Sequence, residues 1–421
     1  MDKQSLTPLL YACSTRCIKS IQQFLAEGSA LRSHIHQEHS EIVYSVLGFA
    51  LTETCPMNII DVLIEALSSR RKELLELAIG ILSSERLRQL DISQDQTLDE
   101  RTSDVYNALT EIGTAIPVAL YSHSKNLGTV FHMKRLNTEV ADRLYDAGFR
   151  DIEGYNAQGL TPLMSLAFIF FRSSESYSSL LSWFVSKGAN IMTLQRDQHS
   201  RALHFIAAQF GHFIAGQWLF YPEGLSSRFM RQCIKEISYA IERSGGLPLV
   251  LRTTDCCSCA CSLSGCTMTV SMMKSYLSCA KTCKFDRVSP GNAEIRFDLW
   301  VSLTAAEPEL TAEVVTEILR LILFEELELS HTCCRITSDG VFEAFKDATD
   351  RCTIQEEEAD IIQHLEDLLK ISISRWQDFS GPLSVFIKKF IADELDYSPH
   401  DWDEDYAKKV EDLGVKLDRS P

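Results

Sequence analysis

A short pattern that recurs along the chain constrains its fold more than any other feature. The first copy opens at Thr7-Pro8-Leu9, continues through two stretches of apolar residues and ends at Gly28. A threonine side chain accepts a hydrogen bond from a free N–H of a helix's first turn, and proline at the first helical position gives up no hydrogen bond. Glycine ends a helix because it adopts the left-handed backbone conformation without strain. The pattern predicts two short amphipathic helices joined by a turn.

The same opening recurs at three later positions. A copy without Thr-Pro begins at Ser45-Val46-Leu47, and the most complete copy runs from Gly159-Leu160-Thr161-Pro162 to Gly188-Ala189. A fourth copy opens at Arg201-Ala202-Leu203-His204. We interpret the serine-rich stretch 172–179 as an insertion between paired helices, which would lengthen the last spacing. Helix pairs repeated in this way predict a stacked array with a shared core.

The repeating unit resembles the ankyrin repeat, whose signature is a T-P-L-H-x-A opening at a period of about 33 residues. Four longer segments extend the likeness over nearly the whole chain, and together they are similar to a group of uncharacterised ankyrin-repeat proteins of filamentous fungi. These segments are S-V-L-G-F-A-L-T-E-T-C-P, R-L-Y-D-A-G-F-R-D-I, C-S-C-A-C-S-L-S-G-C and E-E-L-E-L-S-H-T-C-C. The resemblance implies an architecture but no established activity. It also places His204 at the signature's histidine, whose hydrogen bonds tie adjacent turns together.

The stretch 71–158 has helical periodicity without these openings. Its apolar residues at helical spacing are Leu74, Leu75, Ala78, Ile81 and Leu82, then Val105, Leu109 and Ile112, then Leu136, Val140, Ala141 and Leu144. The last group leads to Gly148 and is interpreted as the second half of a worn repeat. The middle of the chain is therefore predicted to be a diverged continuation of the array.

The C-terminal part predicts further helices. We expect one buried helix over Ala312–Glu326, and a second helix carrying Ile361, Ile362, Leu365, Leu368 and Leu369 behind the acidic first turn Glu356-Glu357-Glu358. A last amphipathic helix carries Val385, Phe386, Phe390 and Ile391, which we assign to core packing in preference to a partner-binding face. Residues 341–421 hold 20 acidic and 10 basic side chains, so this tail is expected to be solvated.

A dense group of cysteines lies between the array and the tail. Cys257, Cys259 and Cys261 alternate, so in an extended segment their side chains share one side, and Ser264-Gly265 allows a turn that returns Cys266 toward them. Thiolates and imidazoles are ligands of tetrahedral zinc. The candidate metal ligands are Cys257, Cys259, Cys261, Cys266, His331, Cys333 and Cys334, of which about four are expected to bind. A closed site of this kind would be structural and would cap the end of the array.

Two other interpretations of the thiols remain open. The spacing differs from the common C-x2-C finger patterns, and free cysteine is among the most buried residue types, so the thiols could be small core residues. We assign Cys279 and Cys283 to the core because they lie four residues apart on a predicted helix with Met272, Met273 and Leu277. A Cys-His dyad, for instance His331 with a cluster cysteine, would instead indicate a reactive thiol.

The predicted fold is all-α: an ankyrin-type helical solenoid with degenerate repeats, followed by a Cys-rich, zinc-clasped helical C-terminal module. The predicted organisation is degenerate ankyrin repeats at 1–70, diverged helical solenoid units at 71–158, ankyrin repeats at 159–250, a Cys-rich zinc module at 251–340 and an acidic helical tail at 341–421. Apolar residues make up 45% and charged residues 24% of the 421 residues, which are proportions typical of a folded protein.

Composition and motifs narrow the function. The net charge of −17 comes with no Lys/Arg cluster, which argues against binding to nucleic acid or anionic membranes. No run of 18 apolar residues and no secretory leader are present, so we expect an intracellular protein, cytoplasmic or nuclear and not secreted, in which the 14 cysteines stay reduced. The P-loop, G-x-G-x-x-G, H-E-x-x-H and G-x-S-x-G patterns are absent.

We therefore expect a monomeric, non-enzymatic scaffold that binds another protein of unknown identity and holds one structural zinc. Repeat arrays bind partners through their loops and concave face, so the loops 28–40 and 189–200 are the expected surfaces. The alternative from another class is an enzyme that uses a reactive cysteine or an open zinc site. Zinc-dependent nucleic-acid binding is a third hypothesis, which the charge disfavours.

Overall fold

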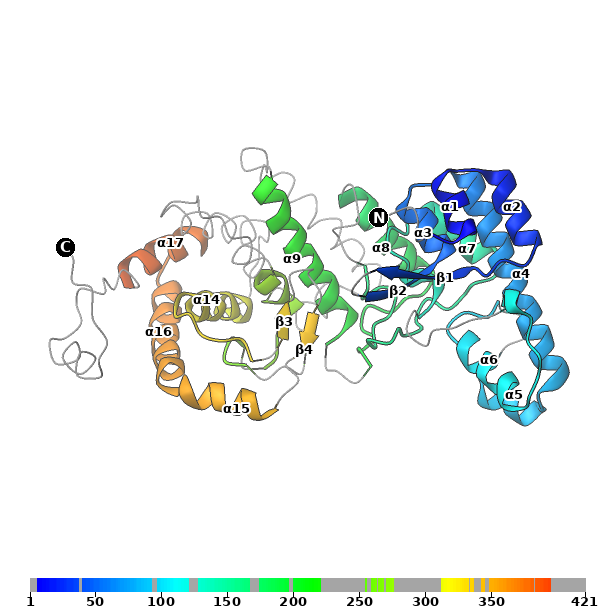
Figure 1. Ribbon diagram of the computed structural model, residues 1–421. Helices are drawn as coiled ribbons and strands as arrows, with labels where there is room; N and C mark the ends of the chain where they lie inside the picture. The colour runs from blue at the N-terminus through cyan, green and yellow to red at the C-terminus, as the bar shows by residue number, and fades with distance from the viewer. Residues whose placement is uncertain are drawn as a thin grey trace.

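The computed structural model is mostly helical in the parts it describes, which confirms the predicted dominance of helices (Figure 1). Its described strands form two short antiparallel hairpins, β1–β2 and β3–β4, which the all-α prediction did not include. The structure describes residues 6–37, 40–92, 97–120, 128–166, 174–196, 200–220, 254–255, 259–262, 264–268, 270–275, 312–332, 334–336, 342–344, 348–381 and 383–394.

Two pairs of helices with a hairpin between them form the N-terminal end. They are α1 (Pro8–Ser14), α2 (Ile18–Ala26), β1 (Arg32–Gln37), β2 (Ser40–Ser45), α3 (Val46–Thr52) and α4 (Met57–Ile81). The predicted helix start at Thr7 is confirmed, because the Thr7 side chain accepts a hydrogen bond from Leu10 N at 3.5 Å. Gly28 has φ +83° after α2, and Ser45 accepts from Gly48 N at 2.9 Å before α3.

The helix α4 continues past residue 70, where the first repeat block was expected to end, and its C-terminal half leaves the main core. There it packs with α5 (Ser84–Gln89), α6 (Thr102–Glu111) and the 3-10 turn η2 (Val118–Leu120). We call the apolar core of this unit the side cluster; it consists of Leu74, Leu75, Ala78, Leu82, Leu98, Val105, Ala108, Leu109 and Leu120. Ile81 and Ile112, which were expected in the same stripes, are exposed because they face away from this small core.

A threonine-capped turn that the sequence did not predict begins at Thr129. Thr129 caps the 3-10 turn η3 (Val130–His132), and His132 Nδ1 accepts from Thr129 N at 3.0 Å. His132 Nε2 therefore carries the proton and donates to Leu160 O at 2.9 Å, which ties this turn to the next opening. Burial lowers the pKa of His132 to about 4, so the ring is neutral near pH 7. The helix α7 (Thr138–Asp146) follows this turn and ends before Gly148, which has φ +103°.

The segments predicted as the later repeat copies contain α8 (Ser174–Ser186) and α9 (Ala202–Phe220). The expected insertion at 172–179 is wrong in part, because α8 already begins at Ser174 and takes these serines into its first turns. His204 is fully buried, and its Nδ1 accepts from Arg201 N at 3.3 Å within its own turn. In Figure 1, α9 lies between the N-terminal helices and the C-terminal elements.

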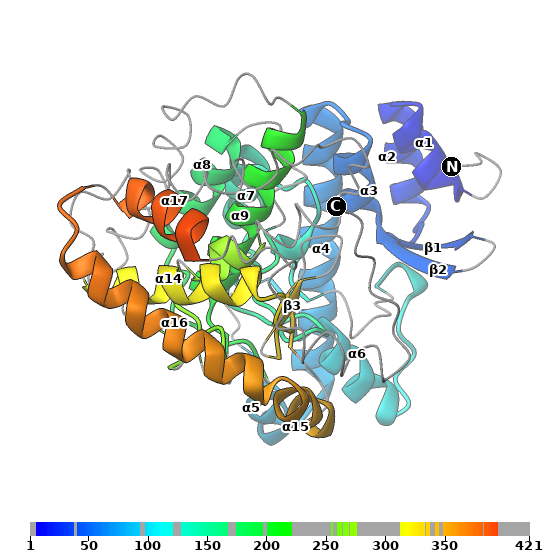
Figure 2. The same cartoon turned by 90° about the vertical axis from the view of Figure 1, so that its left-hand side faces the viewer.

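The C-terminal end contains four helices and the second hairpin. They are α14 (Ala312–Glu326), β3 (Cys334–Ile336), β4 (Phe342–Ala344), α15 (Ala348–Glu357), α16 (Ala359–Gln377) and α17 (Leu383–Glu394). The predicted bounds of α14 are confirmed at both ends. Figure 2 shows α14 alongside α16, with which it makes direct contact.

Two details of this region differ from the prediction. Glu356 and Glu357 end α15 instead of starting the next helix, and Glu358 is the residue before α16. Phe386 and Phe390 are buried as expected, and Phe386 packs against Trp376 with ring centroids 5.4 Å apart, whereas Ile361 and Val385 are exposed.

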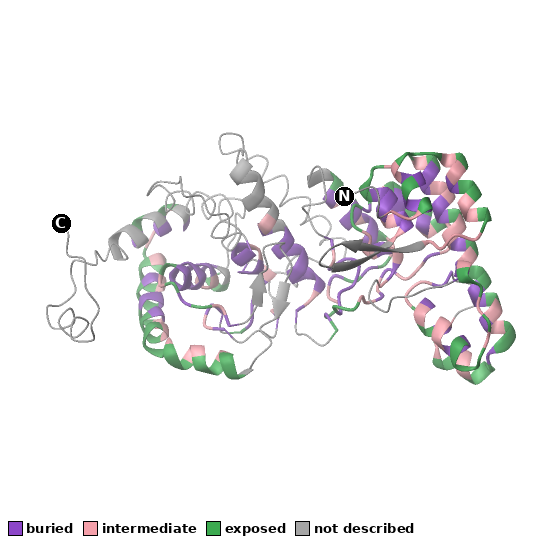
Figure 3. Cartoon of the chain, in the orientation of Figure 1, coloured by how far each residue is buried: buried purple, intermediate pink, exposed green. Residues whose placement is uncertain are grey.

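One continuous core joins the two ends of the molecule. Its buried members run from Leu9 in α1 to Phe390 in α17, and they include Cys259, Cys261 and Cys266. Figure 3 shows buried segments in both ends of the molecule. Among the residues the structure describes, no helix combines the length and the apolar character needed to cross a bilayer. The described thiols Cys259, Cys261 and Cys266 are thus members of the main core.

We predict that Gly148→Ala destabilises the protein more than Gly188→Ala. Both glycines have φ +103°, a conformation that costs an L-residue about 1–2 kcal/mol. A Cβ at Gly188 meets nothing within 4 Å, whereas one at Gly148 would lie 2.5 Å from Thr97 Oγ1. Thr97 would have to move, and it now donates from N to Gly148 O at 3.2 Å and from Oγ1 to Ala147 O at 3.2 Å. Guanidinium unfolding midpoints measure the difference, and equal losses would contradict it.

Candidate metal centre

Three predicted ligands meet in the folded chain. The sulfurs of Cys259 and Cys261 and a ring nitrogen of His331 all lie within 4.8 Å of one another. Cys259 and Cys261 are buried, and His331 is partly buried. Because thiolate and imidazole are metal ligands, this group is close enough to hold one metal ion.

The loop that carries the thiols is closed by its two ends. Asp255 N donates to Cys266 O at 3.0 Å, and Cys266 N donates to Asp255 Oδ1 at 2.6 Å. Gly265 has φ +97°, and a Cβ there would lie 1.9 Å from Asp255 O, so only glycine fits this crossing. The turn predicted at Ser264-Gly265 is confirmed, and it brings Cys266 back beside the start of the loop.

The extended arrangement expected for the alternating cysteines is wrong at Cys259 and Cys261, while Cys257 lies outside the described residues. Ser262 N donates to Cys259 O at 3.0 Å, which makes residues 259–262 a tight turn. The Ser262 hydroxyl also donates to Gly265 O. Cys259 and Cys261 therefore approach each other across a turn, because local hydrogen bonds replace the strand partner that an extended segment would need.

His331 is oriented by a buried acid. Its Nε2 lies 2.7 Å from Glu325 Oε1, and its ring packs on Phe324 with centroids 4.6 Å apart. The nitrogen facing a carboxylate carries the proton in a neutral imidazole, so the lone pair belongs to Nδ1. That atom lies 3.9 Å from Cys259 Sγ. A carboxylate behind a histidine is the usual outer-shell arrangement of metal ligands.

The helix α14 anchors the loop as well as His331. Arg320, whose side chain is 3% exposed, donates through Nη1 to Ala260 O at 2.9 Å and through Nη2 to Glu366 Oε2 at 2.7 Å. Thr267 Oγ1 donates to Glu317 Oε2 at 2.8 Å. Burial raises the pKa of Glu317, an effect that the Thr267 hydroxyl opposes. Cys259 and His331 are 72 residues apart in the sequence, and the contacts between α14 and the loop hold them together.

The remaining candidates have different positions. Cys266 is fully buried, but its sulfur lies 3.3 Å from Lys274 Nζ and is not one of the three grouped ligands. Cys334 begins β3, where the structure describes the backbone. Cys257 and Cys333 lie outside the described residues, as do Cys279 and Cys283.

Two residues beside the grouped ligands, Glu325 and Lys274, were not among the predicted site residues. Glu325 had a detectable signal, because an acid six residues before a candidate histidine, at the end of a predicted helix, can fold back onto it. Lys274 had none, since a single lysine in an apolar helical stretch looks like a surface residue until the packing is known.

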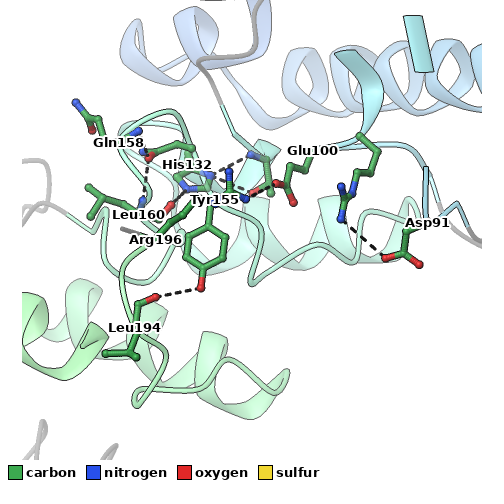
Figure 4. A network of polar contacts seen from close by, with 11 residues as sticks. Asp91, Glu100, His132, Tyr155, Gln158, Leu160, Leu194 and Arg196 are labelled. Atoms are coloured by element: carbon green, nitrogen blue, oxygen red, sulfur yellow. Dashed lines mark hydrogen bonds and ion pairs between the residues drawn. The ribbon is translucent and has the colours of Figure 1, made fainter. Parts of the chain in front are cut away.

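The loop expected to bind a partner forms a polar network with its neighbours (Figure 4). Arg196 pairs with Glu100 at 3.5 Å and lies over the Tyr155 ring, 4.8 Å from its centroid. Tyr155 donates to Leu194 O at 3.0 Å. Arg196 N also donates to Gly159 O at 2.9 Å, so this arginine holds the loop in place. Leu194, on the same loop, is 44% exposed.

A pair of acids lies next to this network. The Asp151 and Glu100 carboxyl groups share a hydrogen bond. Burial, and then the charge of Glu100, raise the pKa of Asp151 to about 6, which the Gly154 backbone N–H opposes. A carboxyl group in this position is protonated over part of the mildly acidic range.

The comparisons with known proteins add no family. A scan against protein-family models found no match, and a search of curated proteins found no significant similarity. The candidate chemistry therefore rests on the site itself.

We predict that Asp151→Asn flattens the pH dependence of stability between about pH 4 and 6. The folded carboxyl binds its proton more tightly than the unfolded one, whose pKa is 3.8. Its stabilising contribution is therefore complete below pH 4 and is lost as pH rises through about 6. An amide removes this titration. Urea midpoints at pH 4.5, 5.5 and 6.5 measure the slope, with Asp91→Asn, 89% exposed, as the control. Parallel curves for all three proteins would rule out the carboxyl pair.

Proposed function

We propose that this protein is a protein-binding scaffold whose C-terminal part is held together by a structural zinc centre. The observation that carries the proposal is the grouping of Cys259, Cys261 and His331, with Glu325 behind the histidine. Cys259 and Cys261 come from the thiol loop, and His331 comes from the segment that follows α14. A metal at this point would join the loop to α14.

The donor set supports zinc. Two thiolates and one imidazole form a soft and borderline donor set, which suits zinc better than the oxygen-seeking magnesium or calcium. The Glu325 carboxylate leaves the Nδ1 lone pair of His331 directed toward the thiols. The cysteines that the structure describes are free thiols, as zinc ligands must be before they lose their protons.

Burial supports a structural role for the metal. Cys261 is fully buried and Cys259 is 6% exposed, so a bound ion would be largely shielded from solvent. Structural zinc sites contribute about 10–16 kcal/mol of binding free energy at neutral pH. That energy would stabilise the closed loop and its contacts with Arg320 and Thr267.

The architecture supports binding of another protein. Helix pairs with loops between them present side chains on one surface, and the resemblance to ankyrin repeats points to the same use. The β1–β2 hairpin extends from the N-terminal helices in Figure 2, and Leu194 offers an exposed apolar side chain on the loop after α8. The acidic net charge favours a protein partner over nucleic acid.

An open zinc site is the second candidate. The grouped residues supply three ligands, and three protein ligands with one open position are the arrangement of catalytic zinc sites, including Cys2His. A metal-bound water in the fourth position would then support hydrolysis or another acid–base reaction. A zinc ion with a water oxygen in its coordination shell would favour this candidate.

We predict about one zinc per chain in protein purified without added metal. Plasma mass spectrometry should find the metal in the wild type and in Cys352→Ser, whose thiol is exposed in α15. The double variant Cys259→Ser, Cys261→Ser should lose it and melt at a lower temperature, because the loop then depends on hydrogen bonds alone. Metal-free wild-type protein with an unchanged melt after chelator treatment would reject the zinc centre.

We predict that Leu194→Asp weakens partner binding at least about tenfold, or ~1.4 kcal/mol, without lowering the melting temperature. A charge at this exposed position removes an apolar contact but leaves the Leu194 carbonyl available to Tyr155. A partner recovered by cross-linking to tagged protein would be purified and titrated against both forms. Val118→Asp, 75% exposed on η2, is the control. Equal dissociation constants for all three proteins would exclude the loop 189–200 as the contact surface.

A further inference from the structure

We propose that Cys266 is the third thiolate ligand of the metal centre and that Lys274 is the cation that balances the charge of its thiolates. The inference rests on the proposed zinc centre and specifies its composition as three cysteines and one histidine. It also gives a role to a buried lysine that the three grouped ligands leave unexplained.

Lys274 lies among the thiols. Its side chain is 2% exposed, and its Nζ is 3.3 Å from Cys266 Sγ and 3.6 Å from Cys261 Sγ. Cys261 belongs to the grouped ligands and Cys266 does not, so the ammonium bridges the centre and the next thiol. Both cysteines are fully buried. A shared donor between two sulfurs places Cys266 beside the metal position.

Charge balance favours three thiolates. Zinc with two thiolates and a neutral imidazole has no net charge, and a third thiolate would leave the centre at −1. The ammonium of Lys274 restores neutrality, and a buried charge is stable only when it is paired and hydrogen-bonded. Among the acids near the loop, Asp255 accepts a hydrogen bond from Cys266 N and Glu317 accepts one from the Thr267 hydroxyl.

The backbone at Cys266 is already in place for ligation. Its backbone N and O atoms both form hydrogen bonds with Asp255, and Gly265 permits this close approach of the two loop ends. A rotation about χ1 of Cys266 moves only the sulfur and leaves these bonds intact. The loop closure therefore fixes the position from which the third thiolate reaches the metal.

X-ray absorption at the zinc edge tests the ligand set in the full-length protein loaded with zinc. We expect three sulfurs near 2.3 Å and one nitrogen near 2.0 Å in the wild type, and two sulfurs in Cys266→Ser. Cys334→Ser should keep three. Bound zinc whose sulfur number is the same in Cys266→Ser as in the wild type would overturn this inference alone. Wild-type protein that binds no zinc would overturn the proposed function with it. The number of sulfur ligands in the wild type can be measured even if the serine variant fails to fold. Two sulfurs in the wild type would also overturn the inference.

Chelator competition tests Lys274 as a positioning residue. We expect Lys274→Met to weaken zinc affinity about 10- to 100-fold, the usual effect of losing an outer-shell partner, and Lys274→Arg to recover part of it by restoring the charge. Lys370→Met, on the exposed face of α16, should have wild-type affinity. A role in packing alone would lower the melting temperature of Lys274→Met and leave its zinc affinity unchanged, and that result would overturn the charge-balancing role.

Discussion

The hydrogen bonds of the buried Arg320 guanidinium join three segments of the C-terminal half. The guanidinium donates to the carbonyl of Ala260 in the thiol loop and to the carboxylate of Glu366 in α16, from a side chain that is nearly inaccessible to water. A guanidinium in such a place has to be paired on all sides, because an unpaired buried charge costs several kcal/mol. These bonds link α14 both to the loop and to α16. His331, which comes shortly after α14, is thereby brought to the thiols.

The protein has two apolar cores among its described residues. The main core runs through both ends of the molecule and contains the candidate metal centre, whereas the side cluster is attached through the C-terminal half of α4. A ligand bound at the centre would act on the main core, since Cys259, Cys261 and Cys266 are among its members. The polar network around Arg196 holds the loop after α8 by different means, with ion pairing, ring stacking and backbone bonds at a partly exposed surface.

Several local features were predictable because their causes lie within a few residues. Thr7 and Pro8 start α1, apolar spacing defines α14 at both ends, and Gly265 permits the turn before Cys266. Two turns were not predicted. Thr129 begins a single 3-10 turn whose histidine bonds to the distant Leu160. Residues 259–262 form a turn closed by their own hydrogen bond in place of the expected extended segment.

The sequence by itself determined the helical character of the chain, the starts of some helices such as α1 and α14, and the set of thiols and imidazole from which a metal site can be built. Capping, periodicity and glycine turns act over three to five residues, so composition and spacing are sufficient for them. The tertiary structure alone decided which of those ligands meet. Cys259 and His331 are 72 residues apart, and they come together only because α14 packs against the loop through Arg320 and Thr267. Tertiary packing likewise places Glu325 beside His331 and Lys274 beside Cys266, contacts that residue spacing in the sequence does not reveal.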